Sequence, residues 1–470
     1  MSDIEIWNLA GQYHNPEHTP TEIHQAYKDL YTKDANLADE LAKHATKYSD
    51  VGALRALFEA GLTPSYTNKY AQTLLHMVAQ ADSYYVPPVG AIADCVNFLL
   101  DNRVSVLRKD GDGMCCYHYA VHRANLEFIR TLRARDAKLD MTNKFGFTML
   151  HEAAEWFHCS GANSGNNPEI AARFIEMTNE LIDIGLDIDA KNDYGRTAGD
   201  IVIERKCIPL FKLLVSNPTV FQALDMRAYD HITELASNNP NEVCYEGRFK
   251  GQTALGAACV SADTQAVQLL LAAGADVNAK NDAGENALVY LLKTNNPSYD
   301  ALKEKHLSKM LDLFAANGWD KNSAIDANGN NLLIAACKKN FGSSSYNNMS
   351  LESEIMDWLL NNGADVTMAN AAGETALMFA SISNNDKMEN VLISLLENGA
   401  DINARDATGK TALHYAAMNH SQSRARGCGD LLFAFGKVDT STVDNNGKTA
   451  LDTATEHNNE ELVKYLLSKV

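Results

Sequence analysis

A short motif recurs along the chain and constrains its fold more than any other feature. Its clearest copy is Gly409 to Ala417, GKTALHYAA, with a glycine, a threonine two residues later, a leucine and an alanine pair. Closely similar segments begin at Gly146, Gly251, Gly373 and Gly447. Weaker copies begin at Ala71, Gly113, Gly195, Gly284 and Gly329. Self-similarity of this kind predicts a repeat architecture, in which each unit buries its apolar face against the next.

A second block follows the first in fixed order. It reads LLLAAGADVN from Leu269 to Asn278, and it returns at Leu395 to Asn403 and at Leu359 to Val366. The threonine of the first block is a typical helix N-cap, and the alanine pair keeps that first helix thin. The leucines form the buried face of a second helix, which ends at a left-handed glycine. The Asp, Asn and Gly residues that follow predict a turn into the next repeat.

Together, the two blocks resemble the ankyrin repeat, whose period is about 33 residues. Cys115 and Thr148 are separated by that interval, and so are Thr253 and Asn286. The resemblance covers 36–470. It implies an all-α solenoid of stacked helix–turn–helix pairs with β-hairpin-like fingers between repeats, with about twelve repeats in all.

The ends of the array are expected to be capped, because a terminal repeat otherwise exposes its core face. Thr19 to Glu22 (TPTE) has the pattern of a capping box with proline at the first helical position. We therefore expect capping helices in 1–35, one of them over 20–31. Repeats with long loops follow over 36–250, and the C-terminal repeats and cap over 251–470.

Two repeats lack the full motif. Leu54 to Gly61 predicts the second helix of a degenerate first repeat, and Asp230 to Asn239 that of a degenerate sixth repeat. Since each repeat contacts only its neighbours, the degenerate fifth and sixth repeats predict a weak joint. Glu460 to Lys469 is expected to be the closing helix.

Several repeats are longer than the motif requires. The extra residues are expected between the two helices of a repeat, on the edge opposite the fingers, at 81–91, 159–168, 294–305 and 340–350. Long loops in compact folds are often functional. Insertions in surface loops are also tolerated at low cost. Both interpretations stay open.

Composition narrows the choice of partner and compartment. The net charge is −19, which disfavours binding to nucleic-acid phosphates and to anionic lipid. No apolar stretch approaches the roughly 20 residues of a membrane span, and the N-terminus does not look like a secretion signal. Nine scattered cysteines, several at small apolar positions, suit a reducing compartment. We expect the protein to be cytoplasmic.

The fingers carry the candidate binding residues. In the N-terminal half, aromatic rings stand just before the glycine of the motif or beside it, whereas small or polar residues take that place later. Basic side chains accompany these rings, and aromatic and Arg anchors are typical of interface centres. The predicted partner-binding residues are Tyr70, Lys144, Phe145, Phe147, Lys191, Tyr194, Arg196, Phe249 and Lys250. The alternative is that the rings only pack against a neighbouring finger.

Four histidines occupy one position of the motif: His76, His118, His151 and His414. In the family that the chain resembles, this position links adjacent repeats by hydrogen bonds. Repetition at a fixed period also favours an architectural role over a binding site.

Two clusters of cysteine and histidine lack the paired spacing of a zinc site: Cys115, Cys116 and His118, and His151, His158 and Cys159. Cys428 lies between two glycines in an expected loop, where Arg424 and Arg426 would lower the pKa of its thiol. The alternative is an inert thiol in a surface loop.

The function expected from these features is a protein–protein interaction scaffold or adaptor. It would bind a partner protein of unknown identity on the concave surface made of fingers and first helices. The alternative is a bacterial effector or toxin-neutralising inhibitor that is translocated into a host cell and acts by binding. A third hypothesis is an enzyme with a hidden Cys–His site at Cys428 or Cys159. We expect a non-enzymatic monomer with no cofactor or metal, which binds neither nucleic acid nor membrane.

Overall fold

The computed structural model describes residues 19–81, 88–160, 167–293, 306–341, 349–383 and 388–469. These residues form helices joined by turns, with isolated β-bridges but no strand among them. The expected all-α solenoid of helix pairs is confirmed. The chain divides into two compact units, Met1–Pro218 and Thr219–Val470. The division falls between the degenerate fifth and sixth repeats, and the boundary expected at residue 250 lies inside the second unit.

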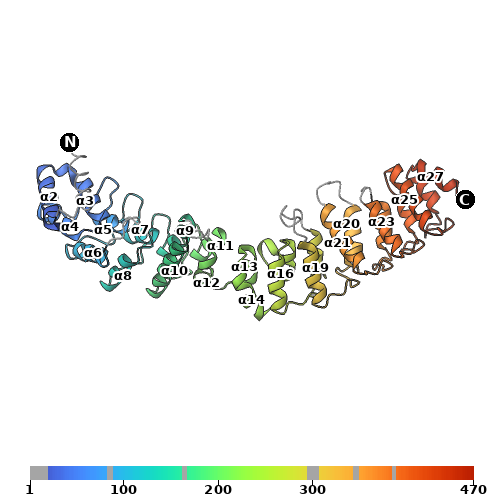
Figure 1. Cartoon of the computed structure of the whole chain (residues 1–470), viewed down its shortest axis with the longest axis horizontal. Helices are drawn as coiled ribbons and strands as arrows, with labels where there is room; N and C mark the ends of the chain where they lie inside the picture. The colour runs from blue at the N-terminus through green and yellow to red at the C-terminus, as the bar shows by residue number, and fades with distance from the viewer. Residues whose placement is uncertain are drawn as a thin grey trace. The chain divides into compact units, whose positions relative to one another are not determined.

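The first unit stacks its helix pairs in two rows, which Figure 1 shows in blue to green. The first helices are α3 (Ala38–Lys47), α5 (Leu74–Ala79), α7 (Cys116–His122), α9 (Met149–Cys159) and α11 (Ala198–Arg205). The second helices are α4 (Val51–Glu59), α6 (Ala91–Asp101), α8 (Leu126–Ala134), α10 (Pro168–Asp183) and α12 (Phe211–Leu214), the last preceded by the 3₁₀ turn η3 (Ile208–Leu210). First helices contact first helices of the next repeat, and α4, α6, α8 and α10 contact one another in the same way.

The second unit repeats this arrangement. Its first helices are α13 (Val220–Met226), α15 (Ala254–Val260), α17 (Ala287–Lys293), α20 (Leu332–Phe341), α22 (Ala376–Ile382), α24 (Ala412–Ala417) and α26 (Ala450–Glu456). Its second helices are α14 (Tyr229–Asn238), α16 (Thr264–Ala272), α19 (His306–Ala316), α21 (Met349–Asn361), α23 (Met388–Glu397), α25 (Gln422–Phe435) and α27 (Glu460–Leu467). Each row is again continuous, because successive first helices contact one another and so do successive second helices.

The start of the described chain is capped as the sequence predicts. α2 (Pro20–Lys33) begins at the N-cap Thr19, whose backbone N–H donates to Glu22 at 2.8 Å in a capping box. The helix contacts α4 and buries Tyr27 completely. α2 is joined to α3 by the 3₁₀ turn η1 (Ala35–Leu37). The expected capping helix is therefore confirmed, whereas 1–18 lie outside the described residues.

The motif residues take the local roles predicted for them. Thr197 and Thr449 accept a hydrogen bond from a backbone N–H of the first turn of their helices. The alanine pair at Ala416 and Ala417 is fully buried where first helices meet. Gly399 ends α23 with a φ of 86°, a left-handed conformation that favours glycine.

The inserted segments fall between the two helices of a repeat, as expected. They separate α5 from α6, α9 from α10, α17 from α19 and α20 from α21. Residues 82–87, 161–166, 294–305 and 342–348 of these segments lie outside the described residues. Whether they bind a partner stays a prediction.

The histidines of the motif join each repeat to the next. The Nδ1 atom of His151 accepts from the backbone N–H of Thr148 at 3.2 Å, so the ring proton is on Nε2. Nε2 therefore donates to the carbonyl oxygen of Arg196 in the next finger, at 2.9 Å. His76 and His414 make the same pair of contacts, to the carbonyl oxygens of Met114 and Lys448. The predicted structural role is confirmed for these three histidines.

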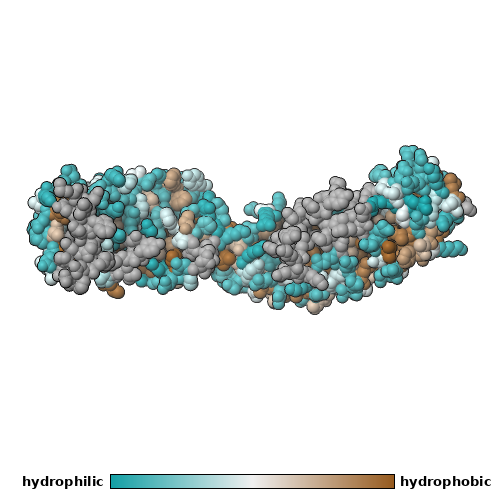
Figure 2. Space-filling model, turned by 45° about the horizontal axis from the view of Figure 1, so that its top comes forward, coloured by the Kyte–Doolittle hydropathy of each residue, from teal (hydrophilic) through white to brown (hydrophobic). Residues whose placement is uncertain are grey.

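The described part of the face drawn in Figure 2 is largely polar. Figure 2 shows hydrophilic residues over most of the visible face, with hydrophobic residues in scattered patches. Single exposed apolar residues are normal on soluble domains. The exposed aromatic side chains are therefore the candidates for a binding surface.

We predict that Thr449→Ala destabilises the last repeat by about 1 kcal/mol, because α26 loses its N-cap acceptor. Hydrogen exchange of the α26 and α27 amides measures the change. Thr455→Ala is the matched control, since the Thr455 hydroxyl only donates back to the carbonyl of Leu451 within α26. Equal protection of these amides in Thr449→Ala and wild type would contradict the assigned cap.

We predict that the free energy of unfolding of the second unit falls as the pH falls from 7.5 to 5.5. Burial lowers the pKa of His414 in the folded chain below its ordinary value. The unfolded chain therefore binds the proton first, near pH 6.5, at about 1.4 kcal/mol per unit of pKa difference. His414→Gln keeps a capping side chain without the titration, so thermal melts should show a smaller loss than in wild type. His420→Gln, which changes an exposed histidine of the same unit, is the control for the loss of one histidine.

Candidate functional site

An Asx side chain organises the backbone of nine of the described fingers. In the finger before α9, the Oδ1 atom of Asn143 accepts from the backbone N–H groups of Phe145 at 2.8 Å and Phe147 at 3.1 Å. The same two contacts, to the residues two and four positions ahead, recur at Asn68, Asp110, Asn192, Asn281, Asp326, Asn370, Asp406 and Asp444. The fingertip backbone is thus fixed without a strand on either side.

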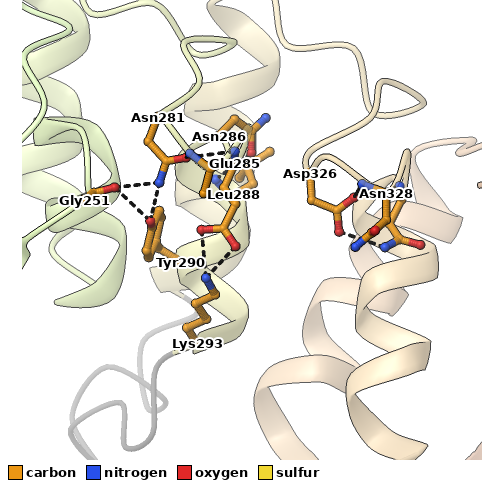
Figure 3. A network of polar contacts seen from close by, with 11 residues as sticks. Gly251, Asn281, Glu285, Asn286, Leu288, Tyr290, Lys293, Asp326 and Asn328 are labelled. Carbon is orange, nitrogen blue, oxygen red and sulfur yellow. Dashed lines mark hydrogen bonds and ion pairs between the residues drawn. The ribbon is translucent and has the colours of Figure 1, made fainter. Parts of the chain in front are cut away.

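The same side chain also anchors several fingers to their first helix. Figure 3 shows Asn281 between Gly251 of the preceding finger and Tyr290 of α17. Its Nδ2 atom donates to the Gly251 carbonyl and to the Tyr290 hydroxyl, both at 2.6 Å. With two bonds accepted at Oδ1, all four hydrogen-bonding positions of this amide are used. In the first unit, Asp110 accepts from the Tyr119 hydroxyl at 2.7 Å.

Neighbouring fingers are hydrogen-bonded to each other in the first unit. The N–H of Gly111 donates to the carbonyl oxygen of Tyr70 at 3.0 Å, and that of Asp193 donates to the carbonyl oxygen of Phe145 at 3.1 Å. The Lys144 ammonium is 3.1 Å from a carboxylate oxygen of Asp112 in the finger before it. These contacts fix the spacing of the fingertips, and with it the spacing of their exposed side chains.

Three aromatic side chains on these fingers are exposed, and we call them the fingertip rings. The exposed fraction is 60% for Tyr70, 44% for Phe145 and 67% for Tyr194. Phe145 and Tyr194, on adjacent fingers, stack with ring centroids 6.5 Å apart. The Lys144 ammonium lies 5.2 Å from the Phe145 ring centroid. Even stacked, the rings leave much of their apolar area open to solvent.

The remaining predicted residues of the first unit surround the rings. Phe147 is half-buried and lies against the ring of His151, with centroids 5.4 Å apart. Lys191 is exposed, and Arg196 is half-buried and forms an ion pair with Glu204 of α11. The structure therefore places these three side chains on the same run of fingers as the rings.

The prediction that Phe249 is an exposed fingertip ring is wrong. Phe249 is only 4% exposed and packs against Phe221 of α13, with ring centroids 6.4 Å apart, so it is not an exposed fingertip ring. The segment after α14 includes the 3₁₀ turn η4 (Gly247–Phe249), which turns the ring inward, and Tyr245 is the exposed ring of this finger at 72%. Lys250 is exposed, but both residues belong to the second unit.

Sequence reasoning missed Trp156 on α9. The ring is 37% exposed and stacks on His122 of α7, with centroids 4.3 Å apart. His122 in turn is 2.7 Å from the buried carboxylate of Glu152. The helical periodicity of α9 could have predicted this exposure. Leu150, Ala153, Ala154 and Phe157 form its buried face, and residue 156 does not lie on that face.

An open pocket adjoins the first of the fingertip rings. It has a volume of about 370 Å³, and its walls come from α3, from the finger 68–72 and from α5. Tyr70 and Met77 supply apolar wall, whereas Asp39, Lys43 and Lys47 supply charges of both signs. The first unit thus has a pocket beside the Tyr70 ring, between α3 and the finger and first helix of the next repeat.

The prediction of a reactive Cys428 thiol in a loop is wrong. Cys428 lies inside α25 and not in a loop, and burial raises the pKa of its thiol to about 12 despite the nearby Arg424. Burial also raises the pKa of Cys116 far above its ordinary value, and Cys159 is exposed at the end of α9. Among the described residues no group of three or more His, Cys, Asp or Glu side chains is placed to hold a metal ion. No helix in that part of the chain is long and apolar enough to cross a membrane.

Comparison with protein families gives three matching models. The model described as "Ankyrin repeats (3 copies)" matches residues 298–406, 343–426 and 389–470. "Ankyrin repeats (many copies)" matches 117–215, and "Ankyrin repeat" matches 250–282. These ranges lie in both units and together take in more than half of the chain.

No curated protein matches this chain. Among solved structures, the crystal structure of EF0377, an ankyrin repeat protein, is 23% identical with a TM-score of 0.35. The match covers 46% of this chain and 98% of that one. With the family matches, the helix pairs and the recurring finger contacts taken together, the chain belongs to the ankyrin-repeat family.

Proposed function

We propose that this protein is a scaffold that binds a partner protein on the fingers and first helices of its first unit. The observation that carries the proposal is the exposure of Tyr70, Phe145 and Tyr194 on one run of hydrogen-bonded fingers. Ankyrin repeats are generally protein–protein interaction modules. Large rings of this kind are the side chains that most often dominate interface energetics.

The fingertip rings are suited to binding because their positions are already fixed. The Asx contacts and the bonds between fingers order the backbone that carries Phe145 and Tyr194 before any partner arrives. An interface made by rigid side chains loses less conformational entropy when it forms. Fixed fingertip positions therefore reduce the entropy that is lost when a partner covers the rings.

The charges near the rings are partly neutralised within the protein. Lys144 is paired with Asp112, and Arg196 with Glu204. Pairs of this kind on an exposed surface contribute little to affinity and more to the rate of encounter. The Lys69 ammonium lies 5.1 Å from the Tyr70 ring centroid, and Lys191 is exposed. We infer that apolar contact with the rings holds the partner, whereas these two lysines adjust its orientation. A stable complex requires roughly 800 Å² on each side, which several adjacent repeats provide.

The test compares affinity capture by the full chain with capture by Tyr70→Ser/Phe145→Ser/Tyr194→Ser. We expect a specific partner to bind wild type and to bind the triple variant at least about 100-fold more weakly, since each ring is a candidate hot spot. Tyr245→Ser is the matched control, because it removes an equally exposed ring from a finger of the second unit. Thermal melts check that all three proteins are equally folded.

Equal binding of the partner to wild type and to the triple variant would overturn the proposed surface. The segments between first and second helices would then be the next candidates for the binding surface. Loss of binding in Tyr245→Ser alone would move the surface to the second unit.

A further inference from the structure

Two tryptophans stand at unusual positions in adjacent repeats of the second unit. After α16 the chain reads Gly-Ala-Asp at 274–276, and after α21 it reads Gly-Ala-Asp at 363–365. After α19, Trp319 replaces the alanine. On α21, Trp358 immediately precedes the buried leucine Leu359. Neither ring is required by the repeat motif.

The two rings lie against each other at the C-terminal ends of α19 and α21. Their centroids are 6.2 Å apart, and their planes are inclined by 24°. Trp319 is 5% exposed and also meets Phe314 edge to face, whereas Trp358 is half-buried. The Nε1–H of Trp358 donates to a carboxylate oxygen of Asp312 at 2.9 Å. The stacked pair therefore joins two consecutive second helices.

A pocket of about 340 Å³ opens at this pair, and we call it the tryptophan pocket. Its lining consists of Asp312, Ala315, Trp319, Asp320, Lys321, Trp358 and Asn362. The carboxylates of Asp312 and Asp320 are exposed, whereas the ammonium of Lys321 donates to the Asn362 carbonyl oxygen. The pocket thus combines indole rings with an excess of negative charge.

We propose that the tryptophan pocket binds an arginine side chain of a partner protein. Indole rings are the aromatic groups that attract cations most strongly. A guanidinium is planar, stacks on aromatic faces and donates to carboxylates through several N–H groups at once. An anion would meet two carboxylates here, and an apolar side chain would remove water from them without compensation.

In a protein, a guanidinium is carried by arginine, so the expected ligand is a segment of a partner protein and not a free cation. The Nε1–H of Trp319 is buried and has no hydrogen-bond partner among the described residues, so it takes no part in the proposed contact. This site is built by second helices of the second unit, so it does not depend on the fingertip rings.

The test records the indole N–H signals of the ¹⁵N-labelled full chain while short peptides are added. The probes are acetyl-Gly-Arg-Gly-amide and the same peptide with citrulline, which has the shape of arginine but no charge. Trp319→Phe and Trp358→Phe identify the two signals. We expect the arginine peptide to shift both signals, the citrulline peptide to leave them in place, and the Trp156 signal to respond to neither.

The decisive variant is Asp312→Asn/Asp320→Asn. Asparagine keeps an acceptor for the Trp358 N–H and for the turn contact that Asp320 makes with Asn322, so the fold is preserved while both charges are removed. We expect binding of the arginine peptide to weaken about fivefold or more, the size of an exposed carboxylate–guanidinium contribution, since both indole rings remain. Asp276→Asn/Asp365→Asn is the matched control, because these residues make the equivalent turn contacts outside the pocket.

Three results would overturn the proposal. Equal shifts with arginine and citrulline peptides would show that charge is not recognised. Unchanged affinity in Asp312→Asn/Asp320→Asn would remove the carboxylates from the site. Absence of any shift with the arginine peptide at millimolar concentration would show that the pocket does not bind this side chain. None of these results bears on the fingertip rings, which are tested separately.

Discussion

The hydrogen bonds of one Asx side chain, which recur in nine of the described fingers, are the contacts on which the rest of the architecture depends. A finger that is too short for a strand leaves backbone N–H groups without ladder partners. Asn143, Asn281 and their equivalents accept from two of these groups, and Asn281 also reaches the preceding finger and the first helix. Turn, helix and neighbouring repeat are therefore held by a single side chain.

Two other contacts extend this connection along each unit. Histidines such as His151 link the cap of a first helix to the carbonyl oxygen of the next finger, and buried alanines allow the first helices to approach closely. Because each repeat contacts only its neighbours, stability is roughly a sum over repeats and interfaces. Solvent-exposed fingertip positions contribute little to that sum. Rings such as Tyr194 and Phe145 are therefore available for the partner binding that we propose.

The two surfaces that emerge differ in the chemistry they offer. The first unit presents three exposed rings on fingers, two of which stack on each other, with nearby charges that are partly paired. The second unit presents a small pocket in which Trp319 and Trp358 lie beside Asp312 and Asp320. We propose the first for broad apolar contact with a partner and the second for one cationic side chain. Variants that change only one of these sites can show whether one partner binds both sites or each site binds its own partner.

Sequence alone determined the helix pairs, their caps and three of the four histidine contacts, because the repeat motif encodes interactions within a repeat or with the next one; Nε2 of His118 has no hydrogen-bond partner among the described residues. It also located α2 and α14 in segments that lack the motif. It did not determine which rings are exposed. Phe249 is buried against Phe221, Cys428 is half-buried within α25, and Trp156 is exposed beside His122. Burial of this kind depends on how side chains from different helices and fingers meet, and only the tertiary structure decides it.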